Sequence, residues 1–100
     1  MTDATILTNQ EVKQNLEMLP KWEYKDYMIS KEFKFKDFVE AFDFLNKLVP
    51  YFESLDHHPD IHIFYNKIKF ELQTHSAGDK ITDLDVKIAQ EIEARYDTRG

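Results

Sequence analysis

The sequence predicts an α+β fold in which three helices pack on one face of a four-stranded antiparallel sheet, in the order α-β-β-α-β-β-α. Three segments carry apolar residues at helical spacing, and two others alternate apolar and polar residues on either side of a short turn. The 100 residues, of which 42% are hydrophobic and 14% aromatic, suffice for one core and leave no room for a second. Residues 1–100 are therefore expected to form a single domain.

The first helix is expected at about residues 9–18. Thr8 and Glu11 have the spacing of a capping box, in which each side chain satisfies a free backbone amide at the helix start. Val12 lies one position further along and belongs to the apolar face. Pro20 follows closely, and the helix should end before it because the residue that precedes a proline disfavours the helical conformation.

A first hairpin is expected next, with strands near residues 21–25 and 28–35 and a turn at Lys25-Asp26. The second of these strands alternates apolar with polar side chains. The apolar positions on one side of it are Ile29, Phe33 and Phe35. Lys31 falls on the same side and interrupts the apolar pattern.

The second helix is expected to begin at Asp37, whose side chain can cap it while Glu40 reaches back to the helix start. A wide apolar stripe at helical spacing follows and is expected to face the core. The stripe consists of Phe38, Ala41, Phe42, Leu45, Val49 and Phe52. Pro50 lies inside this pattern and should kink the helix or restart it.

The second hairpin has the clearest pairing pattern in the chain. With a two-residue turn at Asn66-Lys67, three apolar pairs fall opposite one another on one side of the ladder. These pairs are Tyr65 with Ile68, Ile63 with Phe70, and Ile61 with Leu72. A slip of one residue would move each apolar side chain to the other face, so the pattern supports this register.

The same ladder brings three of the four histidines together at the open end of the hairpin. Pro59 lacks a donor and should fray the pairing there, but the extended ladder places His58 opposite His75. A longer turn would move His75 by one or two residues along its strand without separating it from His57 and His58.

A loop that contains Gly78 should separate the second hairpin from the last helix. Residues 82–85, with the sequence Thr-Asp-Leu-Asp, are typical of a helix cap. The inward-facing row of the helix that follows is expected to carry Leu84, Ile88, Ala89, Ile92 and Tyr96.

Composition and charge exclude several classes of protein. Without cysteine the chain can form neither disulfides nor thiolate metal sites. A net charge of −6 argues against a general nucleic-acid-binding surface, which needs clustered Lys and Arg. No apolar run approaches the roughly 20 residues of a membrane span, and the first residues lack the basic start and apolar stretch of a signal peptide. We expect a cytoplasmic protein without a nucleic-acid or membrane partner.

The converging histidines suit acid–base chemistry, because histidine can give and take a proton near neutral pH. Two charged imidazoles repel each other, so the pKa values of close histidines should separate and leave a better acid and a better base. Glu53 or Asp56 can orient one of the rings or hold it charged. Such a set suits the removal of water from a polar organic molecule, in which one group protonates the leaving hydroxyl and another removes a proton elsewhere.

Other interpretations of the histidines stay open. Three imidazoles can bind zinc, although adjacent residues on an extended chain point to opposite sides, so His57 and His58 would not easily share one ion. The cluster can also be a solvated loop without chemistry. His62 faces Glu71 across the predicted ladder and is expected to form a surface pair. The sequence has neither a glycine-rich phosphate loop nor a serine or cysteine nucleophile motif.

The pattern from residue 53 to residue 85 resembles the pterin-4a-carbinolamine dehydratase family. That family's pattern is an acidic residue, a His-His-Pro triplet, an aromatic residue, a further His and a final Asp at defined spacing. The matching residues here are Glu53, His57-His58-Pro59, Tyr65, His75 and Asp85. Upstream, Leu19-Pro20-Lys21-Trp22, Phe33-Lys34-Phe35 and Asp37-Phe38 also look like the family, so the resemblance covers nearly the whole chain.

By this resemblance the protein would dehydrate 4a-hydroxytetrahydropterin to quinonoid dihydropterin, recycling tetrahydrobiopterin for aromatic amino acid hydroxylases. The pterin would be the substrate, with no cofactor and no metal, and the protein would be a homodimer or homotetramer. The catalytic residues that the resemblance implies are Glu53, His57, His58 and His75. The substrate-binding residues that it implies are Asp56, His57, His58, Pro59, Gln73, Thr74, His75, Ser76 and Asp85.

For this reaction we assign roles as a hypothesis. His57 and His75 would bracket the hydroxyl and assist its departure, while His58 would act from the other side on the ring or its proton. Glu53 would set the charge of the histidine pair, and Asp85 would support the site from the last helix. Two rival functions remain: a protein-binding or dimerisation module of the same fold that acts as a transcription-factor partner, and a dehydratase for another pterin.

Overall fold

The computed structural model describes residues 4–99, and the helices and strands follow the predicted order. The elements are α1 (Asn9–Leu16), β1 (Glu23–Lys25), β2 (Met28–Lys34), α2 (Phe38–Leu55), β3 (Asp60–Phe64), β4 (Lys67–Leu72), a short 3-10 helix η1 (His75–Ala77) and α3 (Asp83–Thr98). The strands form one antiparallel sheet in the order β1-β2-β4-β3. The two predicted hairpins are therefore joined side by side through β2 and β4.

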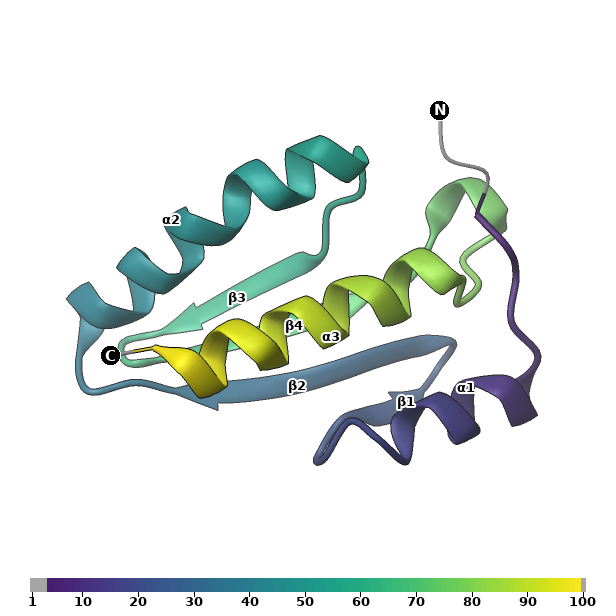
Figure 1. The fold of residues 1–100 in the computed structure, drawn as a ribbon, viewed down its shortest axis with the longest axis horizontal. Coiled ribbons are helices and arrows are strands. Elements are labelled where there is room, and N and C mark those ends of the chain that lie inside the picture. The colour runs from purple at the N-terminus through teal and green to yellow at the C-terminus, as the bar shows by residue number, and fades with distance from the viewer. Residues whose placement is uncertain (1–3, 100) are drawn as a thin grey trace.

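The helices cover one face of this sheet, as predicted. In Figure 1, α3 crosses in front of the strands, α1 lies beside β1, and α2 runs along the β3 side. The buried side chains of β4, which are Ile68, Phe70 and Leu72, alternate with partly exposed polar ones. All three α-helices contribute to the same core, because Val12, Leu48 and Ile88 belong to one cluster with these strand residues.

The helix starts predicted at Thr8 and Thr82 are confirmed. The Thr8 hydroxyl accepts from the Glu11 N–H (3.1 Å), and the Glu11 carboxylate accepts from the Thr8 N–H (2.9 Å). At α3 the Asp85 carboxylate accepts from the Thr82 N–H (2.9 Å). The inward row predicted on α3 is also confirmed, with Ile88 fully buried. The first helix is shorter than predicted and ends at Leu16.

The turn of the first hairpin lies at Asp26-Tyr27, one residue beyond the predicted position. Both residues adopt a left-handed conformation, with φ values of 54° and 59°. Two such residues match the right-handed twist of a tight hairpin. The shift keeps the apolar pattern in register, because Tyr24 then pairs with Ile29.

Lys31 faces the core side of β2, where it interrupts the apolar pattern, and its charge is neutralised there. Its ammonium group forms an ion pair with Glu93 of α3. The same Glu93 oxygen accepts from the Trp22 indole N–H (2.9 Å). One partly buried carboxylate therefore joins α3 to β2 and to the segment before β1.

The register predicted for the second hairpin is wrong by two residues. The turn is Tyr65-Asn66, and Ile63 pairs with Ile68 rather than with Phe70. A shift of two residues leaves every side chain on its predicted face, so alternation alone cannot reveal it. The cause is a long-range contact: the Asn66 carbonyl accepts from the Phe35 N–H (2.7 Å), and the Asn66 amide donates to the Phe35 carbonyl (3.0 Å).

The wide stripe predicted on α2 is only partly buried. Phe38, Phe42 and Val49 are 45%, 36% and 44% exposed, whereas the buried side is formed by Ala41, Phe44, Leu48 and Phe52. A helix that lies on one sheet face buries one side only, so half of a wide stripe is left outside. α2 also continues through Pro50 as a single helix without a restart.

The start of α2 differs slightly from the prediction. The Asp37 side chain caps the helix and accepts from the Glu40 N–H (2.9 Å), as expected. Glu40, however, accepts from the Lys36 N–H (2.7 Å), one residue before the cap.

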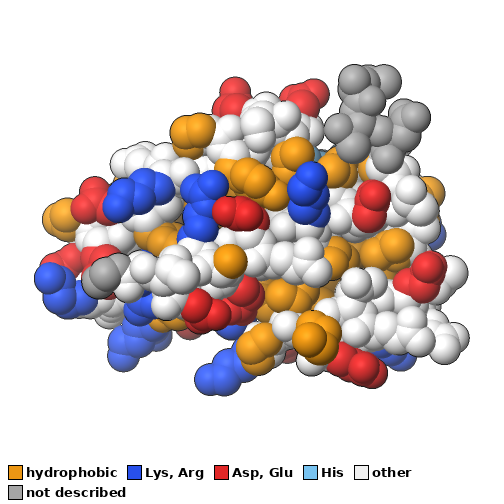
Figure 2. Space-filling model, in the orientation of Figure 1, with side chains coloured by type: hydrophobic (Ala, Val, Ile, Leu, Met, Phe, Trp, Pro, Cys, Tyr) orange, Lys and Arg blue, Asp and Glu red, His pale blue; other side chains and the backbone are white. Residues whose placement is uncertain are grey.

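Within residues 4–99 no helix has the length and apolarity needed to cross a bilayer. Acidic and basic side chains are interspersed over the face that α3 crosses (Figure 2).

Candidate active site

A cavity of about 240 Å³ lies where the chain leaves α2 and where it leaves β4. Its lining consists of Asp56, His57, His58, Gln73, Thr74, His75 and Ser76. A larger open cavity of about 890 Å³ adjoins it and shares Asp56, His57, Thr74 and Ser76. We call the first the histidine cavity, because it brings together three histidines from two separate segments.

Backbone geometry carries the first two histidines into this cavity. Asp56 ends α2 in a left-handed conformation, with φ of 49°, and this turns the chain away from the helix axis. The His57 N–H then donates to the Phe52 carbonyl (3.2 Å), which fixes the next residue against the last helical turn. On the other side of the cavity the Thr74 N–H donates to the Lys80 carbonyl (2.8 Å) and closes the loop that carries His75.

His57 is the buried histidine of the site, and Asp85 holds it. Its Nε2 lies 2.6 Å from Oδ1 of Asp85, whose side chain is fully buried. The other Asp85 oxygen accepts from the Thr82 N–H (2.9 Å) and from the Thr74 hydroxyl (2.8 Å). A carboxylate accepts only, so the proton between the two belongs on Nε2, and Nδ1 is left for a substrate.

His58 is exposed, and Glu53 holds it. A hydrogen bond joins Nε2 of His58 to Oε2 of Glu53, which lies on the last turn of α2. As in the buried pair, a carboxylate on one ring nitrogen leaves the other as a proton acceptor. Pro59 follows and disfavours the helical conformation at His58, so the helix cannot continue there.

His75 is the third histidine, and it too has a carboxylate partner. Its Nδ1 lies 2.7 Å from Oδ1 of Asp79, four residues later and across η1. This hydrogen bond raises the pKa of His75 above its ordinary value, and the charges of Asp79, Asp60 and Asp85 act in the same direction. Burial opposes the shift but is the weaker effect. The raised pKa favours the protonated form of the His75 ring.

Asp79 was missed by the sequence analysis. Residues 76–80 read as a loop around Gly78, and in an irregular loop a spacing of four residues carries no information. The single 3-10 turn of η1 brings the two side chains together. The spacing of His75 and Asp79 pairs charges on one face only where the chain turns helically, so it becomes a signal only once that turn is known.

The other predicted site residues lie in or next to the histidine cavity. Glu53 and Asp85 do not line the histidine cavity but bind two of its histidines, and Pro59 separates His58 from β3. The predicted pairing of His58 with His75 across the ladder is wrong, because the paired strands begin at Asp60 and end at Leu72. The histidines meet instead through the segments that follow α2 and β4.

His62 lies outside this group, on the polar face of the sheet. It pairs with Lys69 in the ladder, yet its Nε2 lies 2.7 Å from Oε1 of Glu71, which gives the predicted surface contact diagonally. Among residues 4–99 no group of three or more His, Cys, Asp or Glu side chains is arranged to hold a metal ion.

Comparisons with known proteins single out one family. The family model described as pterin 4 alpha carbinolamine dehydratase matches residues 5–95. A relative from Sulfurisphaera tokodaii, whose name provisionally describes it as a pterin-4-alpha-carbinolamine dehydratase, is 47% identical over 87 residues, which cover 87% of this chain and 92% of the relative. A relative of the same name from Picosynechococcus sp. is 52% identical over 75 residues, or 75% of this chain and 82% of the relative.

A solved structure agrees with the family match. The crystal structure of a transcriptional coactivator/pterin dehydratase from Brucella melitensis superposes with a TM-score of 0.84 at 39% identity. The match covers 90% of this chain and 97% of that chain. Both the helix order and the four-stranded antiparallel sheet are thus shared with a solved protein of that description.

Proposed function

This chain belongs to the pterin-4a-carbinolamine dehydratase family of hydro-lyases, and we propose that the histidine cavity is where it binds and dehydrates a 4a-hydroxytetrahydropterin. The observation that carries the proposal is that three histidines line one cavity and each is held by its own carboxylate. Such a cavity supplies proton donors and acceptors at fixed positions around one small molecule.

The reaction removes water from adjacent atoms of the pterin. The C4a–OH bond breaks, the hydroxyl leaves with an added proton as water, and N5 loses its proton as the C4a=N5 bond forms. The product is quinonoid dihydropterin. One histidine loses a proton and another gains one, so the pair returns to its starting state by exchange with solvent.

His75 is the proposed acid. The Asp79 hydrogen bond raises the pKa of the His75 ring and so favours its protonated form, and the exposed position of the ring allows the proton to be replaced from water. His57 lies across the same cavity, fixed through Nε2 by Asp85. The Nδ1 atom of His57 would bind the C4a hydroxyl and hold it toward His75.

His58 is the proposed base for the N5 proton. Its Nε2 is engaged by Glu53, so Nδ1 is the atom that accepts the proton. Glu53 then stabilises the imidazolium that forms, because a nearby negative charge favours the charged ring. Of the four other lining residues, Thr74 donates to Asp85, and Asp56, Gln73 and Ser76 would bind the polar edge of the pterin.

The test is the decay of 4a-carbinolamine absorbance in a phenylalanine hydroxylase reaction, with and without the protein. Acceleration over the spontaneous loss is expected, and loss of either the proposed acid (His75→Ala) or the proposed base (His58→Ala) should lower kcat by roughly 100-fold or more. The His62→Ala variant is the matched control and should keep the wild-type rate. No acceleration by the wild-type protein, or wild-type rates in the variants at His57, His58 and His75, would overturn the proposal.

We further propose that this activity recycles tetrahydrobiopterin for aromatic amino acid hydroxylases in the cytoplasm. The support is chemical, because the 4a-carbinolamine is what such a hydroxylase leaves after transferring one oxygen atom. Deleting the gene should slow tetrahydropterin regeneration in extracts that contain the hydroxylase, and adding the pure protein should restore it.

We also propose that the chain forms a homo-oligomer through the exposed side of α2. Phe38, Phe42 and Val49 lie on this side at spacings of four and seven residues and are all more than one third exposed. A contiguous row of this kind is stabilised when a second copy covers it. Binding to a transcription factor through the same row is the alternative, and the Brucella melitensis protein is itself described as a transcriptional coactivator.

A further inference from the structure

The hydroxyl group of Thr82 belongs to the network that holds His57, although Thr82 lies outside the proposed reaction site. Its Oγ1 lies 2.7 Å from Oγ1 of Thr74, which lines the histidine cavity. Thr82 itself is not among the residues that line this cavity or the adjoining one of about 890 Å³. Both threonines are buried, with exposures of 3% for Thr74 and 0% for Thr82, so their hydroxyl groups need partners within the protein.

Backbone pairing fixes both threonines in place. Thr74 forms an isolated antiparallel bridge with Lys80, in which the Thr74 N–H donates to the Lys80 carbonyl (2.8 Å). Thr82 forms a second such bridge with Ile6. The Thr82 N–H also donates to the Asp85 carboxylate (2.9 Å) at the start of α3. The contact between the two hydroxyl groups is therefore set by the fold.

The direction of the hydrogen bonds follows from a count of protons. A threonine hydroxyl has one proton to donate, and an ionised carboxylate has none. Oγ1 of Thr74 lies 2.8 Å from Oδ2 of Asp85, so the Thr74 proton must point to that oxygen. Only the Thr82 proton is then available for the contact between the two hydroxyls. Thr82 therefore donates to Thr74, and Thr74 donates to Asp85.

The reverse direction is disfavoured by the distances. If Thr74 donated to Thr82, the Thr82 proton would have to reach Oδ2 of Asp85 across 3.4 Å. That distance lies beyond the usual range for a hydroxyl donor. No proton would then lie between Thr74 and Asp85, whose oxygens are 2.8 Å apart. The buried carboxylate would lose a short hydrogen bond in exchange for a long one.

We propose that Thr82 is a positioning residue for the dehydration. It acts on His57 through Thr74 and Asp85, because the hydrogen bonds in a chain strengthen one another. Donation from Thr82 strengthens the bond from Thr74 to Asp85 and holds the carboxylate with Oδ1 toward Nε2 of His57. The ring proton of His57 then stays on Nε2, which leaves Nδ1 for the substrate. The effect on rate rests on the proposed function, whereas the proton positions do not depend on it.

Neutron diffraction from crystals of the deuterium-exchanged wild-type protein would locate these protons directly. Deuterium is expected on the Thr82 oxygen toward Thr74 and on the Thr74 oxygen toward Asp85. It is also expected on Nε2 of His57. A deuterium atom on Thr74 that points to Thr82 would overturn the inference. This test needs neither a variant nor a substrate, so it is decisive even where a substitution prevents folding.

Thr82→Val keeps the shape of the side chain and removes its hydroxyl group. Loss of this hydrogen bond should lower kcat roughly three- to tenfold, and KM should change less because residue 82 lines neither cavity. The NMR signals of the His57 ring nitrogens should shift toward those of a ring shared between its two tautomers. Thr82→Ser keeps the hydroxyl and should restore both kcat and the signals. In a Thr74→Val background, Thr82→Val should lower kcat no further, because its effect passes through Thr74.

Thr8→Val is the matched control, because the Thr8 hydroxyl also lies at a helix start, where it accepts from the Glu11 N–H (3.1 Å). Both valine variants should lower the melting temperature, but Thr8→Val should keep the wild-type kcat and His57 signals. Unchanged kcat and signals in Thr82→Val, equal losses in Thr8→Val, or no restoration by Thr82→Ser would each overturn the inference. If the wild type dehydrated no pterin, the proposed function would fall, and the neutron and NMR results would still decide the proton positions.

Discussion

The three carboxylates that hold the histidines differ in burial. Asp85 is fully buried, whereas the side chains of Glu53 and Asp79 are 66% and 64% exposed. A buried carboxylate with several donors supports both the fold and the site, because removing it leaves those donors unsatisfied. An exposed carboxylate affects mainly the ring that it touches. Substitutions at these positions should therefore separate folding from proton transfer.

Asp79→Asn should lower the pKa of His75 toward its ordinary value. The Asp79 hydrogen bond raises this pKa in the folded protein, so the stability it adds is present below the ordinary value of 6.5 and is lost as pH rises through the raised one. The variant should lose activity at lower pH than the wild type, because His75 gives up its proton sooner. NMR titration of the His75 ring and the pH dependence of kcat would measure both effects.

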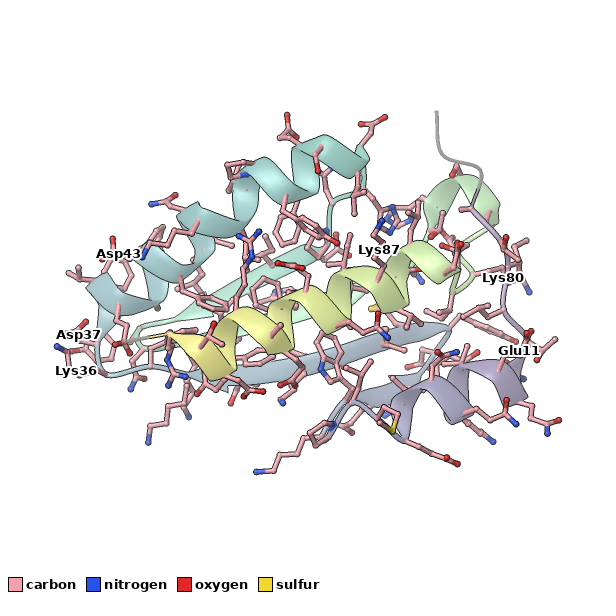
Figure 3. All side chains as sticks on the ribbon, in the orientation of Figure 1. Glu11, Lys36, Asp37, Asp43, Lys80 and Lys87 are labelled. Atoms are coloured by element: carbon pink, nitrogen blue, oxygen red, sulfur yellow. The ribbon has the colours of Figure 1, made fainter. Side chains whose placement is uncertain are left out.

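Asparagine suits the comparison at position 79, because Asp79 has a positive φ of 58°, which Asn tolerates well. Asp43→Asn, at the other end of the molecule, removes the same charge as a control (Figure 3). An unchanged His75 titration in Asp79→Asn would contradict the assigned cause.

Asp85→Asn should destabilise the protein by about 1–3 kcal/mol. An amide can present only one oxygen to the three donors on His57, Thr82 and Thr74, so its NH₂ group must face one of them. Urea denaturation would give the free energy of unfolding. Asp97→Asn, exposed on the same helix, should change it by less than about 0.5 kcal/mol. Equal stabilities of the two variants would show that the Asp85 contacts contribute nothing to folding.

At the level of single elements, local pattern predicted the existence, order and inward faces of the strands. It did not predict strand register, because a two-residue shift gives the same alternation, and the contact of Asn66 with Phe35 that decides it joins residues far apart in the sequence. The prediction that the whole α2 stripe faces the core was wrong for a related reason. Its apolar positions span both sides of the helix, and only the placement of the sheet decides that Phe44 is buried and Phe42 is not.

The sequence predicted which residues come together at the candidate site better than it predicted how they are arranged. His57, His58 and His75 come together as the sequence suggested, yet by the ends of α2 and β4 rather than by a ladder. The resemblance to the family named Asp85 as a site residue, but the neighbouring groups that share its carboxylate follow from tertiary packing. Asp79 depends on one short helical turn that a Gly-containing loop did not indicate.

Pro50→Ala should stabilise α2 and with it the whole domain. Proline inside a helix removes one backbone hydrogen bond and crowds the preceding turn, and Pro50 is exposed, so alanine leaves no hole in the core. After allowance for the stiffer unfolded chain of the proline form, a gain of about 1–2 kcal/mol is expected in thermal or urea denaturation. Asn46→Ala, an exposed change one turn earlier, should gain only about 0.5 kcal/mol. A loss of stability in Pro50→Ala would mean that the helix needs the proline at this point.

On the scale of the whole molecule, the reaction site and the exposed side of α2 are well separated. Phe38 and His57 lie near opposite ends of an 18-residue helix, which spans roughly 27 Å at the helical rise. A second copy bound along Phe38, Phe42 and Val49 would therefore leave the histidine cavity open. Association and catalysis should respond to different substitutions.

Phe42→Asp should dissociate the proposed oligomer and leave dehydration intact. A buried carboxylate without a partner opposes association, so the dissociation constant should rise roughly 100-fold, as measured by sedimentation or light scattering. Gln14→Asp is the control, because it adds one negative charge at an exposed position of a different helix, α1. A monomeric wild type, or equal association of the two variants, would contradict the proposed interface.

The exposed pairing of His75 with Asp79 separates the working pH of the enzyme from its folding. The Asp85 carboxylate caps the start of α3 as well as holding His57, so any change there must also preserve the helix start. The Asp79 side chain, in contrast, is exposed and does not pack in the core. A laboratory effort to move the pH optimum should therefore begin with substitutions at residue 79, where the pKa of His75 is set.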